Sequence, residues 1–202
     1  MTLPFDEYRL PRGRHGIPPD LVRANQRWRL LGACAEALAA RGYSATTVGA
    51  VTELAAVAKP HFYRQFATLS ACVLETYELA AANALAVLED ACGDGPGSQV
   101  LQAALGALLE YLAAEPALAQ VLTDPALDDL PAVAEARAGF VATCVELLAS
   151  ARRNHRPRGA AAEGSCAHLS RGLQGWIHLR LGGEDPEQLA SFTPEVSRIL
   201  AS

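Results

Sequence analysis

The sequence lacks the short motifs with which many enzymes hold a phosphate or activate a nucleophile. Its 202 residues contain no glycine-rich phosphate loop, no Gly-x-Ser-x-Gly turn and no His-Glu-x-x-His pair. An enzyme needs a cofactor site or a convergent set of catalytic side chains. We therefore predict that the protein is not an enzyme, has no catalytic residues and uses no cofactor. Turnover in a broad substrate screen would reopen the enzyme alternative.

Disulfide and metal motifs are also missing. Cysteine occurs five times, but never in a Cys-x-x-Cys pair. An odd number of cysteines, most of them in apolar runs, is typical of small buried hydrophobic residues in a reducing compartment. Zinc needs three or four ligands at suitable spacing, and Cys166, His168 and His178 show no such pattern. We predict no metal site.

Long apolar runs and β-strand patterns are scarce. No apolar run reaches the eighteen residues of a membrane-spanning helix, and residues 1–25 are broken by prolines and charges, unlike a signal peptide. We expect a cytoplasmic protein with no membrane partner. Few segments alternate apolar and polar residues as strands do. Alanine, the strongest helix former, occurs 40 times, so we predict an all-α fold.

Charge is distributed unevenly along the chain. The net charge is −5, but residues 1–67 carry 9 Lys/Arg against 5 Asp/Glu, and residues 68–202 carry 8 against 17. A basic head of +4 on an acidic body of −9 suggests a polyanionic partner for the head alone. We therefore divide the chain into a head, residues 1–67, that begins with a basic arm, and a helical body, residues 68–202.

The head contains the pattern of two short helices joined by a tight turn. A first helix is predicted from Pro18–Asp20 to Arg41, ending at Gly42. Its apolar stripe consists of Leu21, Trp28, Leu31, Ala35 and Leu38.

A second helix is capped by Thr46 or Thr47, with an inner face of Val48, Val51 and Leu54. A turn follows at Ala55–Val57, and a third helix runs from near Ala58 to Phe66. Phe62 and Phe66, four residues apart, face inward. The outward side chains are Lys59, His61, Tyr63, Arg64 and Gln65. This is the pattern that places one helix in the major groove of DNA.

The body is predicted to be a series of helices. A long one covers Leu69–Cys92, and others cover residues 98–113, 116–122 and 130–153. Two more follow after a polar stretch, over Gly164–Leu181 and from Asp185 onward. Their apolar stripes suit a four-helix dimer interface, formed by Leu169, Leu173, Trp176, Ile177, Leu181, Phe192, Val196 and Ile199. Side chains on the body helices that suit a ligand cavity are Tyr77, Tyr111, Phe140, Cys144, His168 and Trp176.

Residues 27–77 resemble the N-terminal domain of the TetR family of transcriptional regulators. The matching residues are Ala40-Arg41-Gly42-Tyr43, Ala45-Thr46-Thr47-Val48, the turn around Val57, and Phe62-Tyr63-x-x-Phe66. The resemblance implies a dimeric DNA-binding protein, usually a repressor, released from its operator by a small ligand. It also implies that Lys59, Pro60 and His61 contact bases, and that Tyr63 and Thr47 contact phosphates.

Three positions depart from the family pattern. The turn glycine is Ala56, the serine that caps the third helix is Ala58, and the lysine at the start of the fourth helix is Leu69. These departures leave one alternative open, in which a regulator-like protein has lost DNA binding and acts through protein contacts. Substitution of Lys59 and Tyr63 by alanine separates the two functions, because only a DNA-binding protein should then lose affinity for DNA.

Our hypothesis from the sequence is a homodimeric, ligand-responsive repressor that binds a double-stranded DNA operator. Lys59, Pro60 and His61 meet base edges, while Thr47, Tyr63, Arg64 and Gln65 hold the DNA backbone. The body is a helical domain for effector binding and dimerisation, and its small-molecule effector is not identified by the sequence.

Overall fold

The computed structural model describes residues 18–92 and 97–153, and every regular element in these two ranges is a helix. The all-α prediction is therefore confirmed for the described chain. The structure divides into two compact units, residues 1–76 (unit 1) and residues 77–202 (unit 2). Residues 154–202 lie outside the described part, and with them lie the two predicted C-terminal helices, the whole predicted dimer stripe (Leu169, Leu173, Trp176, Ile177, Leu181, Phe192, Val196, Ile199) and His168.

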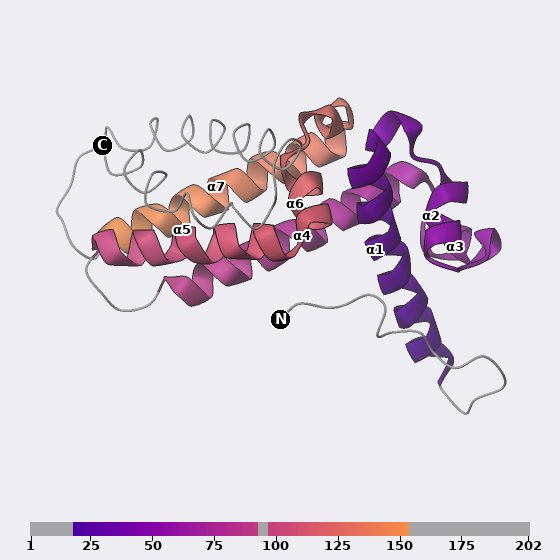
Figure 1. Cartoon of the computed structure of the whole chain (residues 1–202), viewed down its shortest axis with the longest axis horizontal. Coiled ribbons are helices and arrows are strands. Elements are labelled where there is room, and N and C mark those ends of the chain that lie inside the picture. Colours follow the sequence, from indigo (N-terminus) through magenta and orange to yellow (C-terminus); the bar gives the residue numbers. More distant parts are fainter. Residues whose placement is uncertain (1–17, 93–96, 154–202) are drawn as a thin grey trace. The chain divides into compact units, whose positions relative to one another are not determined.

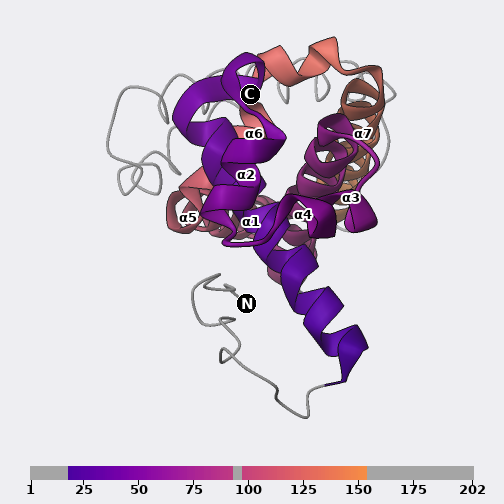
Figure 2. The same cartoon turned by 90° about the vertical axis from the view of Figure 1, so that its right-hand side faces the viewer.

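Unit 1 is built from α1 (Pro19–Ala45), α2 (Val48–Leu54), α3 (Lys59–Gln65) and the first turns of α4 (Leu69–Ala91). Both α2 and α3 pack against α1 and against each other (Figures 1 and 2). The helix signals in the sequence locate these elements to within a few residues. Gly42, the predicted end of the first helix, has φ of +71° and ψ of 171°, and this non-helical residue interrupts α1.

The core of unit 1 is formed by side chains from all four helices. Fully buried residues are Leu30, Cys34, Ala37, Val51, Phe62, Cys72 and Val73. The thiols of Cys34 and Cys72 face each other in this core, and their hydrogen bond, together with burial, raises the pKa of Cys72. Cys34, Cys72 and Cys144 are buried as expected for small hydrophobic residues, whereas Cys92 is half-buried.

Part of the predicted apolar stripe does not enter the core. Leu31, Ala35 and Leu38 are buried, but Leu21 is 60% exposed and Trp28 is 38% exposed. The periodicity correctly assigns the buried face of α1 from Leu31 onward, but it does not report where other helices lie, and α1 meets α3 and α4 through Gln26 and Arg27. The same correction applies to Leu54, which is the last residue of α2 and 45% exposed.

Unit 2 contains the rest of α4, α5 (Gly97–Ala114), α6 (Pro116–Thr123), the 3-10 helix η2 (Pro125–Asp129) and α7 (Pro131–Arg153). Within it, α5 packs against α6 and α7, and η2 packs against α7 (Figure 1). Leu88, Ala104 and Cys144 bring α4, α5 and α7 into one apolar cluster. The sequence reading did not anticipate η2, which begins at Pro125 after the side chain of Asp124 caps the Ala126 amide at 2.9 Å.

By length and composition, α4 is the one described helix that on its own would be long and apolar enough to cross a membrane. However, 44% of its most apolar window is buried inside the protein. The core helix of a globular domain has the same character, so the length of α4 carries no argument for a membrane.

Candidate nucleic-acid interface

The candidate interface is formed by α2, the following turn and α3. The hydroxyl of Thr47 caps α2, where it accepts from the Ala50 amide at 3.2 Å. Thr46, the other candidate cap, is buried and instead donates to the Gly42 carbonyl at 2.7 Å. The two threonines therefore have separate tasks, since Thr46 fastens the end of α1 and Thr47 begins α2.

Two aromatic rings fix α3 on the core. Phe62 is fully buried, Phe66 is nearly so, and their ring centroids lie 5.4 Å apart. Ala58, at the N-cap of α3, makes no side-chain capping bond. The orientation of α3 therefore depends on what holds its inner face and its C-terminal end.

The turn between α2 and α3 reaches a left-handed conformation without glycine. Ala56 has φ of +48°, a region that is unfavourable for residues with a Cβ atom. Arg29 of α1 donates to the carbonyl of Ala55 and, at 3.3 Å, to that of Ala56. The Val57 amide donates to Thr52 at 3.0 Å and closes the turn. A cation from another helix thus stabilises the turn carbonyls where the family pattern has glycine.

The outer face of α3 is open to solvent and positively charged. The exposed residues there are Lys59, Pro60, Tyr63 and Arg64. Within the described chain, neither Lys59 nor Arg64 forms a salt bridge. A Cβ atom placed on Gly49 would lie 3.5 Å from Lys59 Nζ and 3.6 Å from Thr47 Oγ1, so these two polar groups converge over the start of α2. Tyr63 is 58% exposed, and its ring stands edge-on to Phe62.

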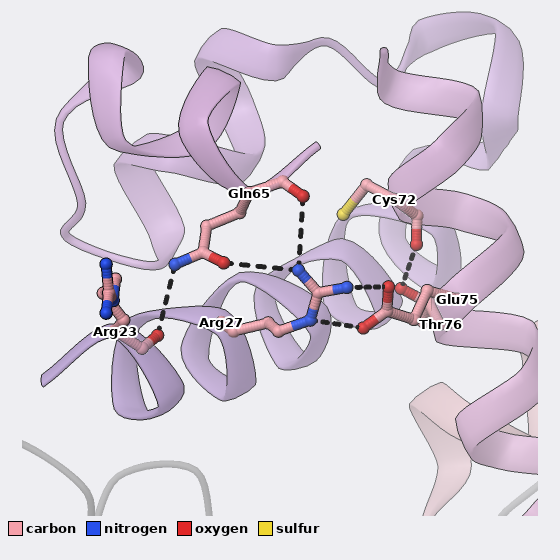
Figure 3. A network of polar contacts seen from close by, with 6 residues as sticks. All are labelled: Arg23, Arg27, Gln65, Cys72, Glu75 and Thr76. Atoms are coloured by element: carbon pink, nitrogen blue, oxygen red, sulfur yellow. Dashed lines mark hydrogen bonds and ion pairs between the residues drawn. The ribbon is translucent and has the colours of Figure 1, made fainter. Parts of the chain in front are cut away.

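Two further predicted contact residues are half-buried and bound to α1. The Nδ1 atom of His61 lies 3.1 Å from Gln26 Oε1, so the tautomer with a proton on Nδ1 donates to that oxygen. Gln65 donates from Nε2 to the Arg23 carbonyl at 3.3 Å and accepts at Oε1 from Arg27 at 3.2 Å. The amide of Gln65 is therefore already engaged within unit 1, as Figure 3 shows.

Sequence reasoning missed three polar residues that shape this surface. Arg27 and Arg29 act on residues 26 to 48 positions away, and no local pattern identifies such contacts. Thr68 was the easier case, because a threonine directly before an apolar helix is a standard N-cap signal. Its hydroxyl accepts from the Ala71 amide at 3.1 Å, so α4 begins at a hydroxyl cap just before Leu69.

The candidate ligand residues that the structure describes lie in unit 2. Phe140 and Cys144 share the apolar cluster of α4, α5 and α7. The fully buried Tyr77 lies instead beneath Arg137, whose guanidinium carbon is 5.2 Å from the ring centroid. Burial raises the pKa of Tyr111 to about 12. The hydroxyl oxygen of Tyr77 is buried and has no hydrogen-bond partner among the residues that the structure describes. The Tyr111 hydroxyl is buried beside Asn83, whose hydrogen bond opposes the rise of its pKa.

Arg137 is a structural cation of unit 2. It donates to the Asp128 carboxylate at 2.7 Å and to the carbonyls of Leu122 and Asp124 at 2.5 and 2.7 Å. These bonds satisfy the carbonyls at the end of α6 and fasten η2 to α7.

Both Cys144 and Tyr77 are buried. Burial raises the pKa of Cys144 to about 12, which keeps its thiol protonated near neutral pH.

Comparison with known proteins agrees with this arrangement. Residues 30–76, which contain α2, α3 and the start of α4, match the family model of the bacterial regulatory proteins of the tetR family. No curated protein matches the chain in sequence.

Several solved structures are similar in fold. The fatty acid degradation regulator FadR from Bacillus halodurans has 15% identity and a TM-score of 0.74, covering 92% of this chain and 96% of its own. FadR from Bacillus subtilis, solved in complex with stearoyl-CoA, has 17% identity and a TM-score of 0.68, covering 86% and 97%. A TetR-like transcriptional regulator from Rhodococcus sp. RHA1 has 17% identity and a TM-score of 0.65, covering 96% and 100%.

At these identities the solved structures show a shared fold and nothing finer. The family model adds the match of the helix-turn-helix segment itself, on the residues that form the α2–turn–α3 surface. Through residues 30–76, this chain carries a segment that matches the N-terminal domain model of the bacterial regulatory proteins of the tetR family.

Proposed function

We propose that this chain is a sequence-specific DNA-binding repressor that acts as a homodimer and responds to a small ligand. The observation that carries the proposal is the outer face of α3, where Lys59, Pro60, Tyr63 and Arg64 are exposed while Phe62 is buried. A helix held by its apolar side, with outward cations that form no salt bridge among the described residues, suits insertion into the major groove. The Thr47 hydroxyl uses its oxygen as an acceptor in the cap, so its proton remains available for a phosphate oxygen.

The contact roles follow from exposure. Lys59 and Pro60 stand at the start of α3, where base edges are read, and Tyr63 and Arg64 are one turn further along. The bond between His61 and Gln26 uses Nδ1, so Nε2 of His61 is left to contact DNA. Gln65 contributes through its bonds to α1, which set the position of α3. Residues 1–67 are thus proposed as the DNA-binding part, and residues 68–202 as the effector-binding and dimerisation part.

A gel-shift titration with the promoter region next to the gene of this protein tests DNA binding. The K59A/Y63A double variant should bind at least tenfold more weakly than wild type, since a lost base or phosphate contact costs about 1–3 kcal/mol. R41A is the matched control, because Arg41 is an exposed cation of the same unit that lies outside α3. Equal weakening by both variants, or no shift by wild type at low salt, would contradict the proposal.

The effector proposal is supported by the buried hydroxyl of Tyr77 in unit 2. Burial of a hydroxyl without a hydrogen bond is unfavourable, and an acceptor group on a ligand would satisfy Tyr77, which has no partner among the described residues. Because the Bacillus subtilis FadR structure holds stearoyl-CoA, we propose a fatty acyl thioester as the ligand class. Added stearoyl-CoA should release the DNA in the same gel shift, with free coenzyme A as the control that lacks the acyl chain. Sedimentation at the working concentration tests the dimer.

A further inference from the structure

Arg27 of α1 lies between the end of α3 and the first turns of α4. Its Nε donates to Glu75 Oε1 at 2.6 Å, and its Nη2 donates to the other oxygen of that carboxylate. Its Nη1 donates to both the backbone carbonyl and the side-chain Oε1 of Gln65, each at 3.2 Å. The guanidinium carbon also lies 4.7 Å from the ring centroid of Phe66. One planar group therefore joins three helices of unit 1 (Figure 3).

The network is better suited to fixing an angle than to stabilising the fold. The side chains of Arg27 and Glu75 remain 38% and 31% exposed, and an ion pair that solvent reaches adds little to stability. A forked guanidinium, in contrast, bonds only when its partners lie in one plane at defined positions. Gln65 is bonded on its other side to the Arg23 carbonyl, so its whole amide is held in place.

The end of α3 is where such control matters. This helix has seven residues, and its N-cap, Ala58, gives no side-chain bond. Its position is set by the burial of Phe62 and Phe66, by the bond between His61 and Gln26, and by the bonds at Gln65. Arg27 therefore limits the rotation of α3 about the two phenylalanine rings. It does so by bonding to Gln65, which directly follows the exposed Tyr63 and Arg64.

We infer that Arg27 is a positioning residue, which through Gln65 and Glu75 sets the orientation in which α3 meets DNA. The inference rests on the proposed DNA-binding function. It makes Gln65 a residue that holds α3 in place through its bonds to α1. It also gives Glu75, an acidic residue, a favourable role in binding a polyanion.

The sign of the Glu75 effect separates positioning from simple electrostatics. Removal of a negative charge beside a DNA-binding surface should strengthen binding if charge alone matters. If Glu75 holds Arg27 in plane, the same removal should weaken binding. A direct phosphate contact by Arg27 is distinguished by salt, because loss of one such contact lowers the slope of log K against log salt by about one.

The test uses the full-length protein and a labelled duplex of the promoter region next to its gene. Fluorescence anisotropy measures affinity at several salt concentrations for wild type, E75Q, R27M and E78Q. Glu78, exposed one turn further along α4, is the matched control for loss of an acidic charge. Thermal unfolding followed by circular dichroism reports whether each variant keeps its fold.

E75Q should bind about fivefold more weakly or worse, as expected for coupled residues in one network, with an unchanged salt slope and a melting temperature close to wild type. R27M should show the same pattern, and E78Q should bind as wild type or more tightly. An E75Q variant that binds as well as wild type overturns the inference, as does a salt slope lowered by about one in R27M. If R27M fails to fold, E75Q alone decides. Failure of wild type to bind overturns the proposed function and this inference with it, whereas a wild type that binds beside an indifferent E75Q overturns the inference alone.

Discussion

Ala56→Gly should stabilise unit 1. Ala56 is exposed and has φ of +48°, so the substitution removes backbone strain without opening a cavity. The left-handed conformation costs a residue with a Cβ atom about 1–2 kcal/mol. Glycine gains freedom in the unfolded chain, which offsets about 0.4–1 kcal/mol of the relief. We expect a net gain of about 0.5–1 kcal/mol in the free energy of unfolding, which for a chain of this length raises the melting temperature by about 1–4 °C.

Urea unfolding followed by circular dichroism measures this gain. The matched control is Ala24→Gly, since Ala24 is exposed in the interior of α1, within the same unit. A glycine inside a helix costs about 1 kcal/mol, so the two alanine-to-glycine substitutions should move stability in opposite directions. Destabilisation by A56G, or equal effects of the two variants, would refute the view that Ala56 is strained and that other contacts hold the turn.

Three further outcomes follow from the described contacts. Arg29→Ala should lower the free energy of unfolding by about 1–2 kcal/mol, because the Ala55 and Ala56 carbonyls lose a charged donor. A urea titration that shows no change would mean that Arg29 does not stabilise the turn. Tyr77→Phe should raise the free energy of unfolding of the ligand-free protein by about 1 kcal/mol, because it removes a buried hydroxyl without a partner in the described chain. A melting temperature below that of wild type would show that the hydroxyl does form a bond. Burial raises the pKa of Tyr111 to about 12 from its usual 10.0, so the folded state favours the neutral phenol. The contribution of this phenol to the free energy of unfolding should be complete below pH 10 and decline as pH rises toward 12. Tyr111→Phe should reduce that decline in pH-dependent unfolding.

The sequence predicted the elements of unit 1 because their boundaries are local. Pro19, Gly42 and Thr47 act on their own turns of helix, and the spacing of Phe62 and Phe66 is enough to identify the inner face of α3. The structure places each of these as expected. The family resemblance, which depends on the same short-range features, was identified for the same reason.

The errors and omissions come from contacts between distant residues. Leu21 and Trp28 have the periodicity of a buried stripe, yet burial requires a facing helix, which periodicity does not report. Arg27 and Arg29 belong to no motif in the sequence and were not singled out, although Arg27 bonds to Glu75, 48 positions along the chain. The predicted contact role of Gln65 depends on the same missing information, since its neighbours Arg23 and Arg27 come from α1.

The bonds from Arg29 to the turn between α2 and α3 limit how short a segment can keep this surface when it is moved to another protein. A peptide of α2 and α3 alone would lack Arg29 and would carry Ala56 in an unfavourable conformation with nothing to compensate it. Any graft of this surface onto another protein must therefore carry α1 and the opening turns of α4, from Pro19 to Thr76. Exchange of the seven residues of α3 alone would transplant the side chains without the scaffold that aims them.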